Sequence, residues 1–259
     1  MPEIAVLLTT YNSSSYLAEL LRSLLSQTYT KWQLFVRDDM STDNTREILE
    51  EYASQDRRIH VLEDSQKRGP KDGFMWLLSQ IEADYYMFCD HDDVWLPEKI
   101  SESINLMTSQ DNHLQIPLIV SVDLKIVDAN LNVKASSFMK DQHYGKTLFN
   151  DKYFHLFYNN IPGCAMLFNR RAKEIALPDP MHIRMHDAWV ATTVLWNGGK
   201  ILHIDKPLIL YRQHGLNTVG VHQVPSYINQ LSRMADLFRK TWRQYRCCRQ
   251  FCNMGFLNF

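Results

Sequence analysis

The first 110 residues alternate short apolar runs with segments whose apolar residues repeat at helical spacing. Residues 4–8 form a continuous apolar run, as expected of a strand that is covered on both faces. The next segment places five leucines on one helical face: Leu17, Leu20, Leu21, Leu24 and Leu25. Further strands are predicted at 32–36, 59–62 and 85–89, with helices between them and a last helix opening at Pro97. This alternation predicts an α/β fold with a Rossmann-like, mostly parallel twisted sheet flanked by helices.

Polar clusters follow three of these predicted strands. They are Thr9 to Asn12 after the first strand, Asp38 and Asp39 after the second, and Asp90 to Asp93 after the fourth. Because open parallel sheets bind ligands at the carboxyl ends of their strands, we expect these clusters to meet on one rim.

The stretch FCDHDDVW, residues 88–95, places three carboxylates and an imidazole within four positions at the end of a buried strand. Clustered carboxylates repel one another and resist desolvation, so such a site usually holds a cation or a shared proton. A turn that caps the following helix is the alternative, but a cap needs fewer acidic residues. The oxygen ligands favour Mg²⁺ or Mn²⁺.

Two common nucleotide-binding patterns are missing from the sequence. The first strand is followed by TTYNSSSY rather than GxGxxG, and no GxxxxGK[ST] loop occurs. A diphosphate would therefore need another counter-charge, which carboxylates holding a divalent metal would provide.

Composition excludes several further classes. With 259 residues and 45% hydrophobic content the chain can bury a full core, and its net charge of −1 gives no basic field for nucleic acid. Five cysteines without a CxxC pair indicate reduced thiols rather than a disulfide framework. Because no basic leader or spanning apolar run is apparent, we expect a soluble or peripheral protein in the cytoplasm.

Four motifs in order carry a family resemblance: VLLTTYN at 6–12, LLSQTY at 24–29, VRDDMSTDNT at 36–45 and CDHDDVW at 89–95. This combination resembles the family-two inverting glycosyltransferases with the GT-A fold, and within them the bacterial rhamnosyltransferase-like branch. The resemblance implies a GT-A domain over 1–223, with a nucleotide-sugar half at 1–110 and an acceptor half at 111–223. Residues 224–259 would form a C-terminal helical extension.

The resemblance also implies residue roles on the donor side. Thr9 and Tyr11 match contacts to the nucleotide, and Asp39 matches the carboxylate that accepts the N3–H of uracil or thymine. Asp90 and Asp92 match the DxD motif, in which the first reaches the ribose and the second binds the metal, while His91 between them is interpreted as a neighbour. Two further implied roles are a donor-sugar contact for Asp93 and a metal ligand for His214.

On the acceptor side, Asp187 resembles the family's general base, with His186 where an acidic residue is more common. A helix N-cap is the alternative for Asp187, and a helix cap is the better interpretation of Asp38. Residues 163–166 resemble a small-residue strand that would let the acceptor pass close to the backbone.

Residues 227–249 carry six basic side chains against one acidic residue, and their apolar residues fall at helical spacing. This pattern predicts a basic amphipathic helix, which would either rest on an anionic membrane surface at the inner face of the cell membrane or simply pack with a solvated basic face.

The sequence therefore predicts an inverting, metal-dependent glycosyltransferase. It would move rhamnose from dTDP-rhamnose, or otherwise a hexose from a UDP-sugar, to a hydroxyl of a cell-surface polysaccharide or lipid-linked glycan. A non-catalytic nucleotide-sugar binder and a sugar nucleotidyltransferase are the alternatives. The nucleotidyltransferase would need a glycine-rich basic triphosphate loop, which TTYNSSSY is not.

Overall fold

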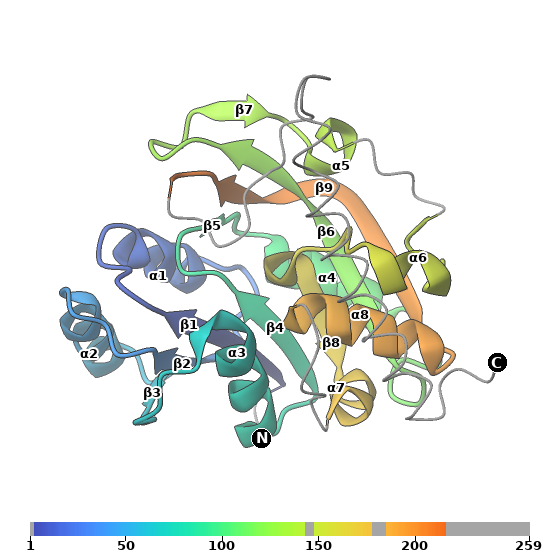
Figure 1. Ribbon diagram of the computed structural model, residues 1–259, viewed down its shortest axis with the longest axis horizontal. Coiled ribbons are helices and arrows are strands. Elements are labelled where there is room, and N and C mark those ends of the chain that lie inside the picture. The colour runs from blue at the N-terminus through green and yellow to red at the C-terminus, as the bar shows by residue number, and fades with distance from the viewer. Residues whose placement is uncertain (1–2, 143–147, 178–184, 216–259) are drawn as a thin grey trace, which may run out of the picture.

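The computed structural model describes residues 3–142, 148–177 and 185–215 (Figure 1). The nine strands of its sheet are β1 (Ile4–Thr10), β2 (Trp32–Asp38), β3 (Ile59–Leu62), β4 (Tyr85–Cys89), β5 (Val94–Trp95), β6 (Leu118–Val127), β7 (Val133–Ala135), β8 (Met166–Asn169) and β9 (Lys200–Arg212). The helices are α1 (Leu17–Leu25), α2 (Thr45–Gln55), α3 (Gly69–Gln80), α4 (Lys99–Thr108), α5 (Phe138–Asp141), α6 (Lys152–Phe157), α7 (Arg170–Ala176) and α8 (His186–Trp196).

The strands form one sheet in the order β3-β2-β1-β4-β8-β6-β9-β5, with β7 added beside β6. The four N-terminal strands are parallel, and the register pairs Ile4 of β1 with Trp32 of β2 and with Tyr85 of β4. This confirms the predicted βαβ order. Beyond β4 the sheet becomes mixed, because β8 runs antiparallel to both β4 and β6, whereas β9 runs parallel to β6. The β4–β8 pairing joins the N-terminal strands and the later strands in one continuous sheet.

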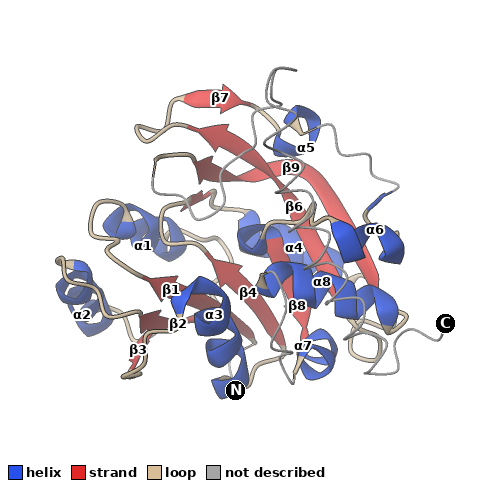
Figure 2. Cartoon of the chain, in the orientation of Figure 1, coloured by secondary structure: helices blue, strands red, loops and turns tan. Residues whose placement is uncertain are grey.

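Helices cover both faces of this sheet (Figure 2). The leucine face predicted for α1 packs on one side with apolar residues of α2 and α4, and Ile4, Val6 and Leu8 of β1 point to that side. Ala5 and Leu7 point to the other side, where α3, α7 and α8 pack. Burial on both faces explains why β1 is apolar throughout instead of alternating.

Three local predictions are wrong. The helix predicted to open at Pro97 begins at Lys99. Residues 163–165 form a 3₁₀ turn rather than a strand, and β8 begins only at Met166. Asp38 is not a helix cap, because the N-cap position of α2 is Asn44.

The basic helix predicted at 227–249 and the boundary at 223/224 lie outside the described residues. Within the described ranges, no helix is long and apolar enough to cross a bilayer.

Candidate active site

The polar clusters that follow β1, β2 and β4 lie at one edge of the sheet. The register places Thr10 beside Asp38 and Leu8 beside Cys89, so the segments that leave these strands start side by side. The carboxyl ends of three neighbouring parallel strands thus form the predicted rim.

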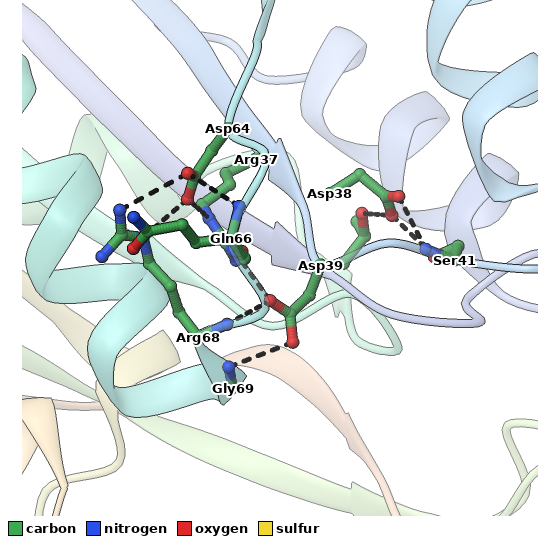
Figure 3. Close-up of polar contacts among 9 residues, drawn as sticks. Arg37, Asp38, Asp39, Ser41, Asp64, Gln66, Arg68 and Gly69 are labelled. Atoms are coloured by element: carbon green, nitrogen blue, oxygen red, sulfur yellow. Dashed lines mark hydrogen bonds and ion pairs between the residues drawn. The ribbon is translucent and has the colours of Figure 1, made fainter.

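The Asp39 carboxylate on this rim is held by three hydrogen bonds (Figure 3). Its Oδ1 accepts hydrogen bonds from Arg37 Nη2 and from the backbone N–H of Arg68, each at 2.7 Å, and its Oδ2 accepts from Gly69 N–H at 3.0 Å. Burial alone would raise the pKa of Asp39, but the hydrogen bonds from Arg68, Arg37 and Gly69 together lower it. Asp39 is therefore a fixed carboxylate at the carboxyl end of β2.

Asp38 holds the adjoining turn instead of capping a helix. Its carboxylate accepts hydrogen bonds from the hydroxyls of Thr10 and Ser41, and from the Ser41 backbone N–H (Figure 3). Within this turn Met40 adopts a left-handed backbone with φ 63°, which is unusual for a residue with a Cβ. The two neighbouring aspartates thus have different roles, one fixing the backbone and the other presenting a carboxylate.

Thr9 and Tyr11, the predicted nucleotide contacts, lie at the end of β1. Thr9 is buried, and a Cβ built on Gly73 of α3 would lie 3.1 Å from its Cγ2. Tyr11 is 44% exposed, and Lys67 Nζ lies 4.2 Å from the centroid of its ring. The backbone N–H of Asp39 bonds to the carbonyl of Thr10, the residue before Tyr11, so Tyr11 adjoins the Asp39 segment and a base could stack on its exposed ring.

The acidic cluster lies mostly buried at the end of β4. Asp93 Oδ1 accepts a hydrogen bond from the Arg212 backbone N–H at 3.0 Å. Burial, followed by the charges of Asp92 and Asp187, raises the pKa of Asp90 to about 7. Burial, followed by the charges of Asp92 and Asp90, also raises the pKa of Asp93 well above its usual range. This mutual repulsion is what a bound cation would relieve.

Asp92 and His214 meet, although they lie 122 positions apart in the chain. His214 Nε2 lies 2.8 Å from Asp92 Oδ2, and both side chains are largely buried. The ring of Tyr16 stacks on His214 with the centroids 4.9 Å apart. The two residues predicted as metal ligands are therefore brought together, and Tyr16 fixes the orientation of the imidazole.

A second group of metal-ligand types lies next to this pair. Ligand atoms of Asp90, Asp93 and Cys164 lie within 4.8 Å of one another. Burial raises the pKa of the Cys164 thiol well above its usual value. Because sulfur is a soft ligand, a hard divalent ion would be held by the carboxylates and the His214 imidazole in preference to Cys164.

Asp187 lies in the first turn of α8, but it is not the N-cap residue, which is Met185. Its Oδ2 accepts a hydrogen bond from Gly163 N–H at 3.1 Å, and its Oδ1 accepts from Ala188 N–H at 2.7 Å. Burial raises the pKa of Asp187 to about 6. A carboxylate with this pKa is well matched to accept a proton near neutral pH.

His186, next to Asp187, faces the core. Its ring stacks on Phe74 at 4.2 Å and meets the edge of Phe88 at 4.5 Å, and burial lowers its pKa to about 3. Neither ring nitrogen has a hydrogen-bond partner among the described residues. A Cβ on Gly163 would lie 2.8 Å from His186 Nε2, so this position has no room for a side chain. The neutral His186 therefore supports the Asp187 turn by packing and not by charge.

Sequence reasoning missed the arginines that organise the site. Arg212 donates from Nε to the Asp92 carbonyl at 2.7 Å, pairs with Glu19 of α1, and lies over the Tyr16 ring at 4.5 Å. Arg37 is fully buried and pairs with Asp39 and Asp64. A signal for Arg37 existed in the tripeptide RDD, because an arginine inside an apolar strand requires acidic partners.

These strands and this rim define a protein of the GT-A glycosyltransferase fold. The structure resembles TarS of S. aureus (residues 1–349) with a TM-score of 0.63 at 20% identity, over 81% of this chain and 60% of that one. It also resembles the mannosyltransferase PcManGT of Pyrobaculum calidifontis in complex with GDP-Man and Mn²⁺, with a TM-score of 0.60 at 16% identity, over 79% of this chain and 55% of that one.

The chain belongs to glycosyl transferase family 2, whose family model matches residues 5–175. It is 27% identical over 234 residues to the dTDP-rhamnosyl transferase RfbG of Shigella flexneri, covering 83% of this chain and 74% of RfbG. It is 32% identical over 106 residues to TuaG of Bacillus subtilis, a protein named for teichuronic acid biosynthesis, covering 41% of this chain and 42% of TuaG. A Rickettsia typhi glycosyltransferase is matched over 56% of its length, so this chain spans about half of these last two relatives.

Proposed function

We propose that the chain is an inverting, metal-dependent glycosyltransferase whose donor is a nucleoside diphosphate sugar. The observation that carries this proposal is the 2.8 Å approach of His214 to Asp92 on a rim that also presents Asp39. Asp39 would accept the N3–H of a pyrimidine base, Tyr11 would stack on that base, and Asp90 would reach the ribose. Asp93 would contact the donor sugar.

Asp92 and His214 would hold Mg²⁺ or Mn²⁺. When bound, such an ion neutralises the charge that develops on a departing diphosphate. The buried Asp92 carboxylate and the His214 imidazole 2.8 Å from it fit that role, and a solved structure of similar fold was determined with Mn²⁺.

Asp187 would act as the general base. An acceptor hydroxyl attacks the anomeric carbon from the face opposite the leaving diphosphate, and Asp187 removes its proton, which gives inversion in a single displacement. The hydrogen bonds from Gly163 and Ala188 fix both carboxylate oxygens, and the pKa of about 6 leaves most of the group ionised at neutral pH.

The proposed donor is dTDP-rhamnose, with a UDP-hexose as the alternative. The similarity to RfbG supports rhamnose. A UDP-sugar is favoured by the similarity to TarS, which has been solved with UDP-GlcNAc. The acceptor would be a hydroxyl of a cell-surface polysaccharide or lipid-linked glycan, since one relative, WfgD of Escherichia coli, is named as a glucosyltransferase acting on a diphosphoundecaprenol-linked sugar.

Calorimetric binding of dTDP, UDP and GDP to the full chain, each with Mn²⁺ and again with EDTA, tests the donor site. We expect metal-dependent binding of dTDP and UDP and much weaker binding of GDP. Incubation with dTDP-rhamnose or UDP-sugars then tests turnover. Release of nucleoside diphosphate supports a transferase, release of pyrophosphate from a sugar phosphate and nucleoside triphosphate would indicate a nucleotidyltransferase, and binding without release would indicate a non-catalytic binder.

The basic stretch at 227–249 would rest on an anionic membrane, where a lipid-linked acceptor is presented. Co-sedimentation with vesicles of phosphatidylglycerol and phosphatidylcholine tests this idea. The full chain should bind more strongly than a chain ending near Val224, and equal binding by both would contradict the proposal.

A further inference from the structure

A buried arginine lies directly behind the carboxylate that is proposed to read the base. The Arg37 guanidinium is fully buried and bonds to two carboxylates. Nη2 donates to Asp39 Oδ1 at 2.7 Å, and Nε donates to Asp64 Oδ2 at 2.6 Å (Figure 3). Nη2 also donates to the backbone carbonyl of Gln66. Arg37 thereby joins the end of β2 to the loop between β3 and α3.

The same loop supplies the remaining donors to Asp39, so that Arg37 and the backbone N–H groups of Arg68 and Gly69 together form what we call the Asp39 cradle. Arg68 pairs with Asp64 through Nε at 2.6 Å, while the backbone N–H groups of Arg68 and Gly69 both point at the Asp39 carboxylate. Asp39 Oδ1 therefore receives two donors and Oδ2 one. Because each carboxylate oxygen can accept about two hydrogen bonds, Oδ2 retains capacity for one donor from a ligand.

The absence of a side chain at Gly73 leaves room for the Arg37 guanidinium. A Cβ on Gly73 would lie 3.1 Å from Arg37 Nη1, which is closer than most such contacts. Nη1 is buried and has no hydrogen-bond partner among the described residues. A buried arginine with an unsatisfied donor is costly for stability, so a role beyond stability accounts for it better.

The charged groups around Asp39 come from every element packed against it. They are Arg37 and Asp38 on the β2 segment, Asp64, Lys67 and Arg68 on the β3–α3 loop, and the Lys71–Asp72 pair in the first turn of α3. Of these, Arg37 is the cation whose guanidinium bonds directly to the Asp39 carboxylate. Asp39 thus owes its ionised form to one buried side chain and two backbone N–H groups.

We infer that Arg37 is a specificity-determining positioning residue, which keeps Asp39 an ionised acceptor so that the site selects bases with an N3–H group over cytosine. Uracil and thymine present a hydrogen-bond donor at N3, whereas cytosine presents an acceptor there. An ionised carboxylate pairs with the first and repels the second, but a protonated carboxyl group can donate to cytosine. The inference rests on the proposed function, because it assumes that Asp39 contacts the base.

The test measures the ratio of UDP to CDP affinity by calorimetry with Mn²⁺ as the pH is lowered from 8 to 6, a range in which N3 of cytosine stays unprotonated. Wild-type protein should prefer UDP by at least about tenfold, the scale of one charge-assisted hydrogen bond, and the ratio should stay flat because Asp39 remains ionised throughout. A wild-type ratio that falls toward one between pH 7 and 6 would overturn the inference, and this measurement needs no variant.

Variants test whether Arg37 positions an ionised Asp39 or only stabilises the fold. In Arg37→Met the ratio should fall at least about twofold between pH 8 and 6, because buried Asp39 loses its cation and takes up a proton on acidification. Asp64→Asn also breaks an Arg37 contact but leaves the arginine charge to Asp39, so its ratio should stay flat. Arg46→Gln, in an exposed pair with Glu50 and Glu63, is the surface control. If Arg37→Met binds all nucleotides more weakly but keeps a flat ratio, Arg37 is merely structural.

A separate ligand, 3-methyl-UDP, tests whether Asp39 contacts the base at all, independently of the role of Arg37. 3-Methyl-UDP lacks the N3–H and should bind wild-type protein at least about tenfold more weakly than UDP. If UDP and 3-methyl-UDP bind equally, Asp39 does not read the base and the proposed function fails at that point. If UDP is preferred to 3-methyl-UDP but Arg37→Met has the wild-type ratio of UDP to CDP affinity at every pH, the contact between Asp39 and the base is supported. The inferred role of Arg37 is then wrong.

Discussion

His214 Nε2 lies 2.8 Å from Asp92 Oδ2, so the segment that follows β9 supplies one side of the candidate metal site and the segment that follows β4 supplies the other. The Arg212 side chain is tied to the Asp92 backbone by the hydrogen bond from Arg212 Nε to the Asp92 carbonyl at 2.7 Å. The two candidate ligands are thus held by Arg212 as well as by their own contact.

Replacing either of the proposed metal ligands, Asp92 or His214, should remove the effect of the metal on donor binding. We expect Asp92→Ala and His214→Ala each to weaken UDP binding in Mn²⁺ by at least about tenfold while leaving the weak binding in EDTA unchanged. Calorimetry with and without the ion measures both. Glu102→Gln, in the exposed pair with Lys206, is the matched control and should behave as wild type. A normal metal response in His214→Ala would remove His214 from the site.

Substituting Asp187, the proposed general base, should separate binding from turnover. Asp187→Asn keeps the hydrogen-bond acceptor for Gly163 but cannot take a proton, so donor affinity should persist while kcat falls about 10²- to 10⁴-fold. Donor binding by calorimetry and nucleoside diphosphate release measure the two effects. Near-normal turnover in this variant would disprove the assignment.

The pH dependence of turnover follows from the same carboxylate. Because Asp187 must be ionised to accept a proton and its pKa is about 6, kcat should rise with pH and level off above about 7. Initial rates at saturating donor and acceptor between pH 5 and 8 measure this profile. A rate that does not change across pH 6 would mean that another group takes the proton.

Removing the Arg212 guanidinium should destabilise the fold. It is buried and bonds the Asp92 carbonyl, while its partner Glu19 is partly exposed and stays hydrated when the arginine is lost, so Arg212→Met should lower the free energy of unfolding by about 1–3 kcal/mol. Arg212→Lys should recover little of this, because lysine lacks the planar fork that reaches several partners. Urea unfolding measures the loss, and Arg46→Gln on the surface should change stability by less than about 1 kcal/mol.

Adding a methyl group at Gly73 tests the space reserved for Arg37. Glycine to alanine in a helix usually stabilises by up to about 1 kcal/mol, but here the new Cβ would lie 3.1 Å from Arg37 Nη1 and from Thr9 Cγ2. Gly73→Ala should therefore gain no stability and should weaken UDP binding by about 1 kcal/mol. Thermal unfolding and calorimetry measure the two effects, and a stabilised variant with full affinity would contradict the packing argument.

The acid sensitivity of His186 can be isolated by substitution. Burial lowers its folded pKa to about 3, whereas an unfolded histidine titrates near 6.5, so the unfolded state binds more protons between these values. His186 therefore costs stability increasingly as the pH falls below about 6.5. The stability of His186→Phe relative to wild type should rise by up to about 1.4 kcal/mol per pH unit toward pH 4, whatever constant offset repacking adds. A difference independent of pH would contradict the buried neutral imidazole.

The N-terminal strands were predictable because each is a local apolar pattern. Residues 4–8 and 85–89 are buried on both faces, so their composition alone identifies them. The long strands β6 and β9 were not predicted, since Asp123 and Lys125 interrupt the apolar pattern of β6 and the register between β6 and β9 shifts near Asp123.

Some features of the candidate site could likewise be predicted from local sequence, and others could not. The clusters after β1, β2 and β4 could be placed on one rim from the sheet rule alone. The approach of His214 to Asp92 required a family resemblance, because sequence spacing says nothing about residues 122 positions apart. The support given by Arg37 and Arg212 depends on which loops cross the rim, and no local pattern specifies that.

The position of β9 has a consequence for how the protein acquires its site during synthesis. The parallel strands β1 to β4 and the Asp39 cradle are built from residues that emerge early, whereas His214 and Arg212 follow more than a hundred residues later. The residues of the proposed nucleobase contact are therefore made before the proposed metal ligands are complete. Metal affinity, and not nucleotide affinity, would then mark the point at which translation has passed β9 and His214.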